Sequence, residues 1–312
     1  MESSGREDSR KGVEVYMRII FNALKTNLGN TGGCKTIVES AKTLRKLGHK
    51  VDIVASKNRY TWDNVKTIKE IPKSDACIAI SCMDIGTTLN AKAGKKVFWK
   101  RGHEVWMMPK DKLLRKISKI ETICNSTWQV EHLKKHGIKS KLCYSGLDLD
   151  LWKTGTTKST KPTIGFLYHE KHKTKRWREC KKIMKIFGDK YEYKILGKDK
   201  FITGKKLVSF YSDCDIWFAP TVLEGFHNPP AEANLCGSLV VCSDNSRCGC
   251  HDYADRVTAE IYYSFDDAVN IFERLRYPDF DTMGKVAIMQ DVLKNKIGSR
   301  EVNMARLVRM LK

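Results

Sequence analysis

Hydrophobic residues along the chain fall into short runs that alternate with stretches of helical periodicity. In the first half, strand-like runs lie at 17–24, 50–56, 65–71, 76–81, 95–100, 121–126 and 139–146. Between them, apolar positions recur at helical spacing over about 33–48, 84–94, 111–120 and 127–136. Strands that alternate with helices in this way predict a parallel sheet with helices on both faces.

The pattern breaks at 153–162, which reads KTGTTKSTKP and lacks hydrophobic periodicity. Its Thr, Ser, Gly and Lys content is typical of a linker. Beyond it, strand-like runs lie at 163–169, 191–197, 214–220 and 238–244, with helices over about 176–188, 204–211, 229–236 and 265–276. We therefore predict an α/β fold in which two Rossmann-like domains face each other across a cleft, where ligands bind.

The domain boundaries follow from this alternation, since 312 residues exceed the usual size of one core. We expect a flexible leader over 1–16, because it is polar and has no signal-peptide core. The first domain covers 17–152 and, after the linker, the second covers 163–280. Basic helices at 281–312 then cross back to the first domain.

Composition favours a cytoplasmic protein, in the host cytoplasm if the chain is viral. No apolar run reaches the length of a membrane span. The 11 cysteines lie in mostly apolar segments, which is typical of buried, reduced thiols. Cys248-Gly-Cys250-His251 holds metal-binding residue types, but zinc sites usually separate paired cysteines by two or more residues and add a second pair. We expect no metal site.

The charge is strongly positive, with 57 Lys and Arg against 36 Asp and Glu, a net +21. Two interpretations stay open at this point. Such a charge attracts nucleic acid, an anionic membrane or phosphorylated substrates. It also fits a lysine-rich composition set by the genome.

A glycine-rich loop, Gly29-Asn-Thr-Gly32-Gly33-Cys34-Lys35-Thr36, follows the first predicted strand and opens a helix. A phosphate-binding P-loop would place glycine where Cys34 stands, so a nucleotide triphosphatase is not favoured. A helix N-terminus with Gly32 and Gly33 suits an anion or substrate hydroxyls, because its N–H groups are free. A tight turn of purely structural importance is the other interpretation.

A second motif, Glu224-Gly-Phe-His-Asn-Pro-Pro-Ala-Glu232, follows a strand-like run of the second domain. Asn228 is a good helix N-cap, and the prolines after it suit the first helical positions. The motif thus predicts a helix N-terminus with a carboxylate on either side. Ionised carboxylates only accept hydrogen bonds, so sugar hydroxyls are natural partners, and Gly225 lets the backbone approach a ligand.

This motif resembles the two glutamates, separated by seven residues, of the retaining GT-B glycosyltransferases, the large family that includes sucrose and glycogen synthases. The resemblance extends to Asn125-Ser126-Thr127-Trp128 and Tyr144-Ser145-Gly146-Leu147-Asp148, which look like the end of the family's first domain. The chain departs from the family at His227, where glycine is usual.

The resemblance implies a hexosyl or pentosyl transfer, with retention, from a nucleotide sugar to a hydroxyl. The first domain would bind the acceptor and the second the nucleotide sugar. It implies neither a metal nor a cofactor beyond that co-substrate, and we favour UDP over GDP as its carrier.

The resemblance also implies roles for single residues. Glu232 would hold the ribose hydroxyls and Glu224 the donor sugar, with His103 near the reacting centre. Backbone N–H groups around Phe226 and His227 would meet the distal phosphate, and we place Gly225 and Asn228 in the same donor-binding loop.

The family binds the diphosphate with an Arg and a Lys in the loop after the strand at 163–169. Lys175 matches the Lys and is assigned a catalytic role. The Arg has no clear match, and Lys171 or Lys173 stands in for it.

The acceptor is not fixed by the resemblance, so charge decides between hypotheses. Basic residues interleaved with Trp99, Trp106, Trp128 and Trp177 favour phosphates along a duplex. Our leading hypothesis is transfer to a hydroxymethylated base in DNA, as in phage glycosyltransferases. The alternative is a glycan or lipid-linked acceptor at an anionic membrane, with the helix over 111–120 as the nearest amphipathic candidate. A non-catalytic basic nucleic-acid-binding protein is a minor alternative. We infer no obligate protein partner.

Overall fold

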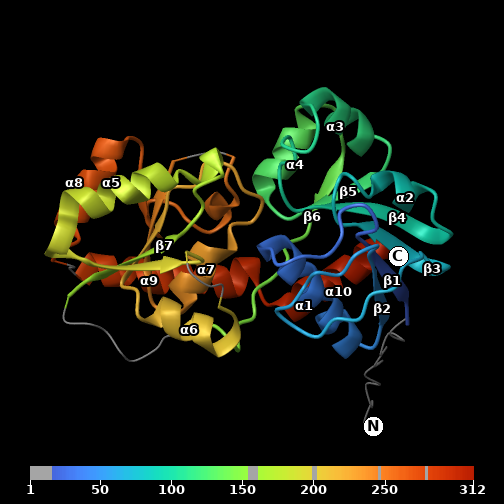
Figure 1. The fold of residues 1–312 in the computed structure, drawn as a ribbon, viewed down its shortest axis with the longest axis horizontal. Helices are drawn as coiled ribbons and strands as arrows, with labels where there is room; N and C mark the ends of the chain where they lie inside the picture. The colour runs from blue at the N-terminus through green and yellow to red at the C-terminus, as the bar shows by residue number, and fades with distance from the viewer. Residues whose placement is uncertain (1–15, 154–160, 199–201, 245–246, 278–279) are drawn as a thin grey trace, which may run out of the picture.

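The computed structural model describes residues 16–153, 161–198, 202–244, 247–277 and 280–312. The predicted leader over 1–16 and linker over 153–162 therefore lie almost wholly outside the described residues. Two α/β lobes stand side by side, each built on its own parallel sheet (Figure 1). This is the predicted fold class.

The first lobe is a parallel sheet in the order β2-β1-β3-β4-β5-β6. Its strands are β1 (Arg18–Asn22), β2 (Lys50–Val54), β3 (Ser74–Ala79), β4 (Ala93–Lys100), β5 (Glu121–Cys124) and β6 (Ser140–Leu142). Its helices are α1 (Gly32–Lys46), α2 (Ile85–Leu89), α3 (Lys110–Ile117) and α4 (Thr127–Lys134). The strand order reverses between β1 and β3, so the loop after β1, which carries the glycines, lies at the switch point where such sheets bind ligands.

The second lobe is a parallel sheet in the order β11-β10-β9-β7-β8. Its strands are β7 (Thr163–Leu167), β8 (Glu192–Leu196), β9 (Ile216–Ala219), β10 (Leu239–Ser243) and β11 (Glu260–Tyr262). Its helices are α5 (Trp177–Phe187), α6 (Gly204–Ser212), α7 (Asn228–Leu235), α8 (Phe265–Arg274) and α9 (Phe280–Val292). Here the order reverses between β7 and β9, which brings the loops after these two strands together.

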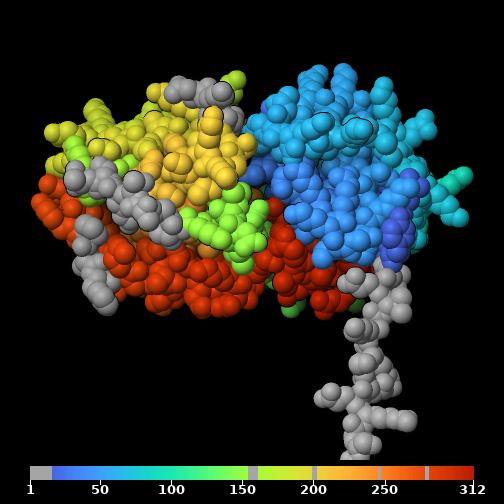
Figure 2. Space-filling model, turned by 90° about the horizontal axis from the view of Figure 1, so that it is seen from below, coloured from blue at the N-terminus to red at the C-terminus, as the bar shows by residue number. Residues whose placement is uncertain are grey.

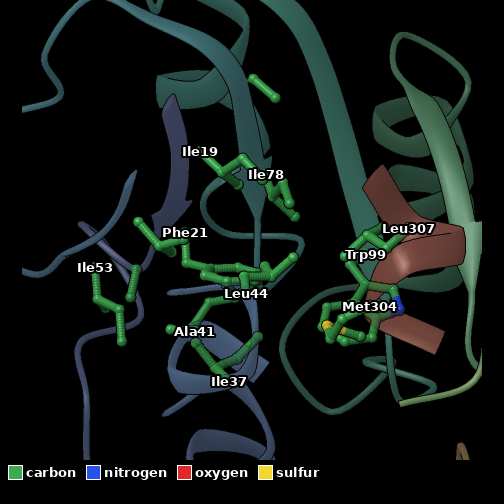
Figure 3. Close-up of a cluster of buried hydrophobic side chains, with 14 of the residues drawn as sticks. Ile19, Phe21, Ile37, Ala41, Leu44, Ile53, Ile78, Trp99, Met304 and Leu307 are labelled. Atoms are coloured by element: carbon green, nitrogen blue, oxygen red, sulfur yellow. The ribbon is translucent and has the colours of Figure 1, made fainter. Parts of the chain in front are cut away.

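The C-terminal segment returns to the first lobe. α9 packs on β10 and α7, a π-helical turn follows (Leu293–Ile297), and α10 (Arg300–Leu311) packs on α1. Met304 and Leu307 of α10 are fully buried in the first-lobe core, beside Trp99 of β4 (Figure 3). In Figure 2, which views the molecule from below, the orange and red C-terminal segments lie along the lower edge of both lobes.

Two predicted elements were wrong in detail, and one strand was missed. The run at 65–71 forms only an isolated bridge between Val54 and Ile68, because its alternating side chains are largely exposed beyond the edge of the sheet. The helix predicted over 84–94 stops at Leu89, and β4 begins at Ala93. The sequence patterns also missed β11, a three-residue edge strand.

None of the helices in the described part of the chain is both long and apolar enough to span a bilayer.

Candidate active site

The loop that carries Glu224 leaves β9 at the switch point of the second sheet. Its backbone pairs with the loop after β10: Glu224 N–H donates to Arg247 O at 3.2 Å, and Gly249 N–H donates to Glu224 O at 3.3 Å. α7 then begins at Asn228, with His227 rather than the predicted Asn228 at the N-cap. The helix starts one residue earlier than predicted, and Pro229 and Pro230 still lie in its first turn, where a missing N–H leaves no bond unmade.

The Glu224 loop also touches the first lobe. The Trp128 indole Nε1 donates to the carbonyl oxygen of Glu224 at 2.7 Å. A Cβ on Gly225 would overlap the carbonyl oxygen of Arg101. The close approach that requires glycine at this position is therefore to the backbone of the first lobe.

Glu224 and Lys175 meet at this switch point. Lys175 Nζ lies 3.0 Å from Glu224 Oε2, and the lysine side chain is only 13% exposed. Lys175 ends a short 3-10 turn (Lys173–Lys175) after β7, and Val222 N–H donates to Thr174 O at 2.9 Å to join the two loops. The structure thus brings together the two residues that were assigned to the donor sugar and the diphosphate.

The other lysines proposed for the diphosphate lie differently. Lys171 and Lys173 are exposed, on the solvent side of the loop that holds Lys175. Lys175, by contrast, is largely buried and paired with a motif glutamate.

Glu232 is buried in α7, one turn in from the start of the helix, and interacts across the two lobes. Its Oε1 lies 3.6 Å from Lys35 Nζ of α1, and the Tyr211 hydroxyl donates to its Oε2 at 3.2 Å. Lys35 also lies over the Trp152 ring, 5.2 Å from its centroid. Burial and the neighbouring carboxylate raise the pKa of Tyr211 well above its usual value, so this hydroxyl remains a donor.

Lys35 was not predicted as a site residue. Its position one turn into α1, directly after the exposed Gly32 and Gly33, was the available signal. No protein atom lies within 4 Å of where a Cβ on Gly32 would stand. Gly32 therefore leaves open space at the helix N-terminus near Lys35, whereas a Cβ on Gly33 would lie 3.5 Å from a terminal nitrogen of Arg101.

His103 follows β4 and is buried between rings. Its centroid lies 5.8 Å from that of Trp128 and 5.0 Å from that of His132. Burial, then the positive Lys100, lowers the pKa of His103 to about 4, so the imidazole is neutral at physiological pH. Among the described residues its Nδ1 has no hydrogen-bond partner. Trp128 connects this neutral histidine to the Glu224 loop.

The side chains of Phe226 and His227 are both buried. The Phe226 ring packs against Tyr144 and Tyr253, with centroids 5.9 and 5.3 Å away. His227 is 2% exposed, and its carbonyl oxygen accepts from the Tyr253 hydroxyl at 2.5 Å. That their backbone N–H groups meet the distal phosphate stays a prediction.

Two further residues near the site escaped the sequence patterns. His169, at the end of the β7 segment, has its pKa lowered to about 4 by burial and then by the positive Lys175. Arg101 donates to the carbonyl oxygen of Gly33 and to that of Ile80, the latter at 2.9 Å. Arg101 therefore fixes the glycine loop against the ends of β3 and β4.

A pocket opens beside Glu232 between the lobes. The first lobe contributes Lys35, Glu39, Tyr60, Trp62 and Asp63, and the following segment contributes Asp148, Leu151 and Trp152. The remaining lining residues are Thr203, Gly204, Glu232 and Arg300. Aromatic walls with a few carboxylates and cations suit a ligand with a flat ring and hydroxyl groups.

Comparison with known proteins gives the fold. No protein-family model and no curated protein matches the sequence. Anabaena HepE in complex with UDP and glucose has a TM-score of 0.75 at 13% identity, over 95% of this chain and 99% of that one. Sucrose-phosphate synthase from Thermosynechococcus elongatus has a TM-score of 0.70 at 12% identity, over 95% and 99%.

A third similar structure is WaaG, a glycosyltransferase involved in lipopolysaccharide biosynthesis. Its TM-score is 0.68 at 11% identity, over 93% of this chain and 99% of that chain. At 93–95% coverage of this chain, all three matches span both lobes. The chain has the GT-B fold of two Rossmann-like domains.

Proposed function

We propose that this protein is a retaining glycosyltransferase that uses a UDP-sugar. The observation that carries the proposal is the pairing of both motif glutamates with lysines at the interdomain site, Glu224 with Lys175 and Glu232 with Lys35. Similar structures support the donor class, since HepE was solved with UDP and with UDP-glucose.

Each pair binds a different part of the donor. Lys175 is the cation best placed to stabilise the negative charge that develops on the departing diphosphate. Glu224 then accepts hydrogen bonds from the sugar hydroxyls and Glu232 from the ribose hydroxyls. The open helix N-terminus at Gly32 and Gly33 offers N–H groups to the transferred sugar or the distal phosphate.

In the transfer step, the bond from the anomeric carbon to the diphosphate oxygen breaks. The acceptor oxygen bonds to the same face of that carbon, and a diphosphate oxygen takes the acceptor proton. The products are UDP and the glycoside, with the anomeric configuration kept. No metal takes part in this proposed step. Neutral His103 has a nitrogen available to accept a hydrogen bond from a sugar hydroxyl.

The acceptor we propose is a hydroxymethylated base in DNA. Trp106 is 65% exposed and Met107 is 41% exposed. Both lie between His103 and the basic helix α3. Exposed aromatic rings stack on bases, and lysines neutralise phosphates. The apolar face of α3 is not free for a membrane, because Leu113 and Ile117 are fully buried in the first lobe.

The test is a product assay. The protein is incubated with each common nucleotide sugar and with DNA that contains hydroxymethylcytosine. The DNA is then digested, and the masses of its nucleosides are measured. We expect one donor to add the mass of a sugar to the modified base. Glycosylation of a lipid-linked glycan in parallel reactions, without any gain on DNA, would assign the acceptor to the membrane alternative.

A binding measurement separates the enzyme from a basic DNA-binding protein. UDP should bind to the wild type, and Lys175→Ala should weaken that binding at least tenfold. Lys181→Ala, on the same lobe and 53% exposed, is the matched control and should bind UDP normally. DNA binding without any UDP binding would favour the non-catalytic alternative.

A further inference from the structure

A cluster of sulfur and imidazole donors lies buried behind the Glu224 loop. It consists of His227, Cys248 and Cys250, whose ligand atoms all lie within 4.8 Å of one another. Nδ1 of His227 lies 3.9 Å from Sγ of Cys248. All three side chains are at most 2% exposed.

The cluster joins two segments that the sequence keeps apart. His227 is the N-cap of α7, whereas Cys248 and Cys250 stand at the 3-10 turn (Gly249–Asp252) after β10. The residue between the cysteines must be glycine, because a Cβ on Gly249 would overlap the carbonyl oxygen of Gly225. The fold thus supplies the third donor that the short Cys-Gly-Cys spacing lacks.

We propose that His227, Cys248 and Cys250 form a binding site for a thiophilic divalent cation, with Zn²⁺ the best match. This differs from the expectation, drawn from sequence, of no metal site. Two thiolates and a neutral imidazole are donors that Zn²⁺ prefers. Two thiolates also balance the charge of the cation, which a buried site requires.

The observed spacing suits this ion. Bonds of about 2.3 Å to sulfur and about 2.0 Å to nitrogen place tetrahedral ligand atoms roughly 3.5–3.8 Å apart. The separations found, none above 4.8 Å, need to contract by no more than about 1.3 Å at any pair. A further sulfur is close, since the Cys242 thiol at the end of β10 hydrogen-bonds with that of Cys250.

The position of the cluster gives the ion a structural role. Cys248 and Glu224 are partners in an isolated parallel bridge, and Gly249 N–H donates to Glu224 O. His227 lies three residues beyond Glu224 on the same loop. An ion bound here would fasten both loops together and hold the Glu224 backbone in place, behind the site of transfer. This inference does not depend on the proposed glycosyltransferase function.

The first experiment measures the metal directly in the full chain. The protein is purified in a reducing, chelator-free buffer with Zn²⁺ present, passed through a desalting column, and its zinc content measured. We expect about one tightly held Zn²⁺ per chain. After chelation, Co²⁺ should give the near-ultraviolet absorption of thiolate-bound cobalt. No retained zinc and no thiolate absorption would overturn the proposal.

Variants then locate the ion. Cys248→Ser, Cys250→Ser and His227→Gly should each lower zinc retention at least tenfold. Cys180→Ser is the matched control, because Cys180 is an equally buried thiol on α5 of the same lobe. Equal zinc retention in the control and in the three variants would place the ion elsewhere and refute the site.

A third measurement does not depend on how the variants fold. Hydrogen exchange of the wild type is compared between the apo and the zinc-loaded protein. Zinc should slow exchange at least tenfold in the segments at 224–227 and 247–250, with no change in the first lobe. Unchanged exchange in both segments would contradict the proposal, whether or not the protein transfers a sugar.

Discussion

At the residue scale, each glutamate of the motif is paired with a lysine. The sequence was enough to identify the spacing of Glu224 and Glu232. It was also enough to match Lys175 to the lysine with which the family binds the diphosphate. It did not reveal the partner of Glu232, because Lys35 lies in the other lobe and reaches the glutamate only through tertiary contact. Each pair combines a group that accepts hydrogen bonds from hydroxyls with a cation for phosphate.

Replacing Glu224 should affect transfer much more than folding. Glu224→Gln keeps the size of the side chain but removes the charge and the ion pair with Lys175. We expect sugar transfer to fall by about 10²–10³-fold, the range for removing one group that stabilises the reacting centre. Initial rates with the donor found by the product assay measure it.

The matched control is Glu170→Gln, at an exposed glutamate of the same lobe that pairs with Lys181. It should retain full activity. Near-normal turnover of Glu224→Gln would reject the assigned role.

The neutral imidazole of His103 makes a pH-dependent contribution to stability. Its folded pKa of about 4 lies below the usual 6.5, so between these values the unfolded chain binds more protons. The free energy of unfolding should therefore fall as the pH drops from 6.5 towards 4. Relative to His103→Gln, the wild type should lose no more than about 3 kcal/mol over this interval.

Urea unfolding at a series of pH values measures this difference between the two proteins. The exposed His172 supplies the control, and His172→Gln should follow the wild-type pH profile. A wild-type advantage over His103→Gln that stays constant from pH 6.5 to 4 would show that His103 is not buried as a neutral ring.

At the scale of elements, the short helix α7 and the returning helix α10 matter most. Two prolines lie in the first turn of α7, and Glu232 follows in the next turn. α10 completes the core of the first lobe although it follows the whole second lobe in the chain. The hydrophobic core of the first lobe is therefore incomplete without α10.

The packing of α10 leads to a prediction about stability. Leu307 is fully buried against the first-lobe core, so Leu307→Ala should cost about 2–5 kcal/mol in the free energy of unfolding. Thermal or urea unfolding measures the loss. Val302→Ala on the same helix, at a residue 53% exposed, should change stability by no more than about 0.5 kcal/mol. Equal effects of the two changes would contradict this packing.

At the scale of the whole molecule, backbone contacts set how the lobes meet. Gly225 touches Arg101, Trp128 donates to Glu224, and Thr127 N–H donates to Asp252 at 3.0 Å. These contacts bring the end of β4 and the start of α4 to the loops after β9 and β10. The distance between His103 and the donor loop depends on this interface.

A methyl group at Gly225 should disturb that interface. Gly225→Ala must move either the Glu224 loop or the first lobe, at a cost of about 1–3 kcal/mol. We expect a lower urea midpoint and a larger radius of gyration in X-ray scattering. Gly86→Ala is the control, since nothing lies within 4 Å of a Cβ there. Its alanine in α2 should be neutral or stabilising by about 0.5–1 kcal/mol. A Gly225→Ala protein as stable and compact as the wild type would refute the contact.

Local patterns in the sequence determined the alternating strands and helices, the two α/β lobes and the spacing of the two glutamates. They could do so because hydrophobic periodicity, prolines and glycines act over a few residues. They misplaced the edge of each sheet. The run at 65–71 is largely exposed, and β11 has only three residues, which are too few to show a periodic pattern. Tertiary structure alone decided that Lys35 faces Glu232, that α10 fills the first core, and that His227 meets Cys248 and Cys250. Each of these contacts joins segments far apart in the chain, and only the packing of the whole fold brings such segments together.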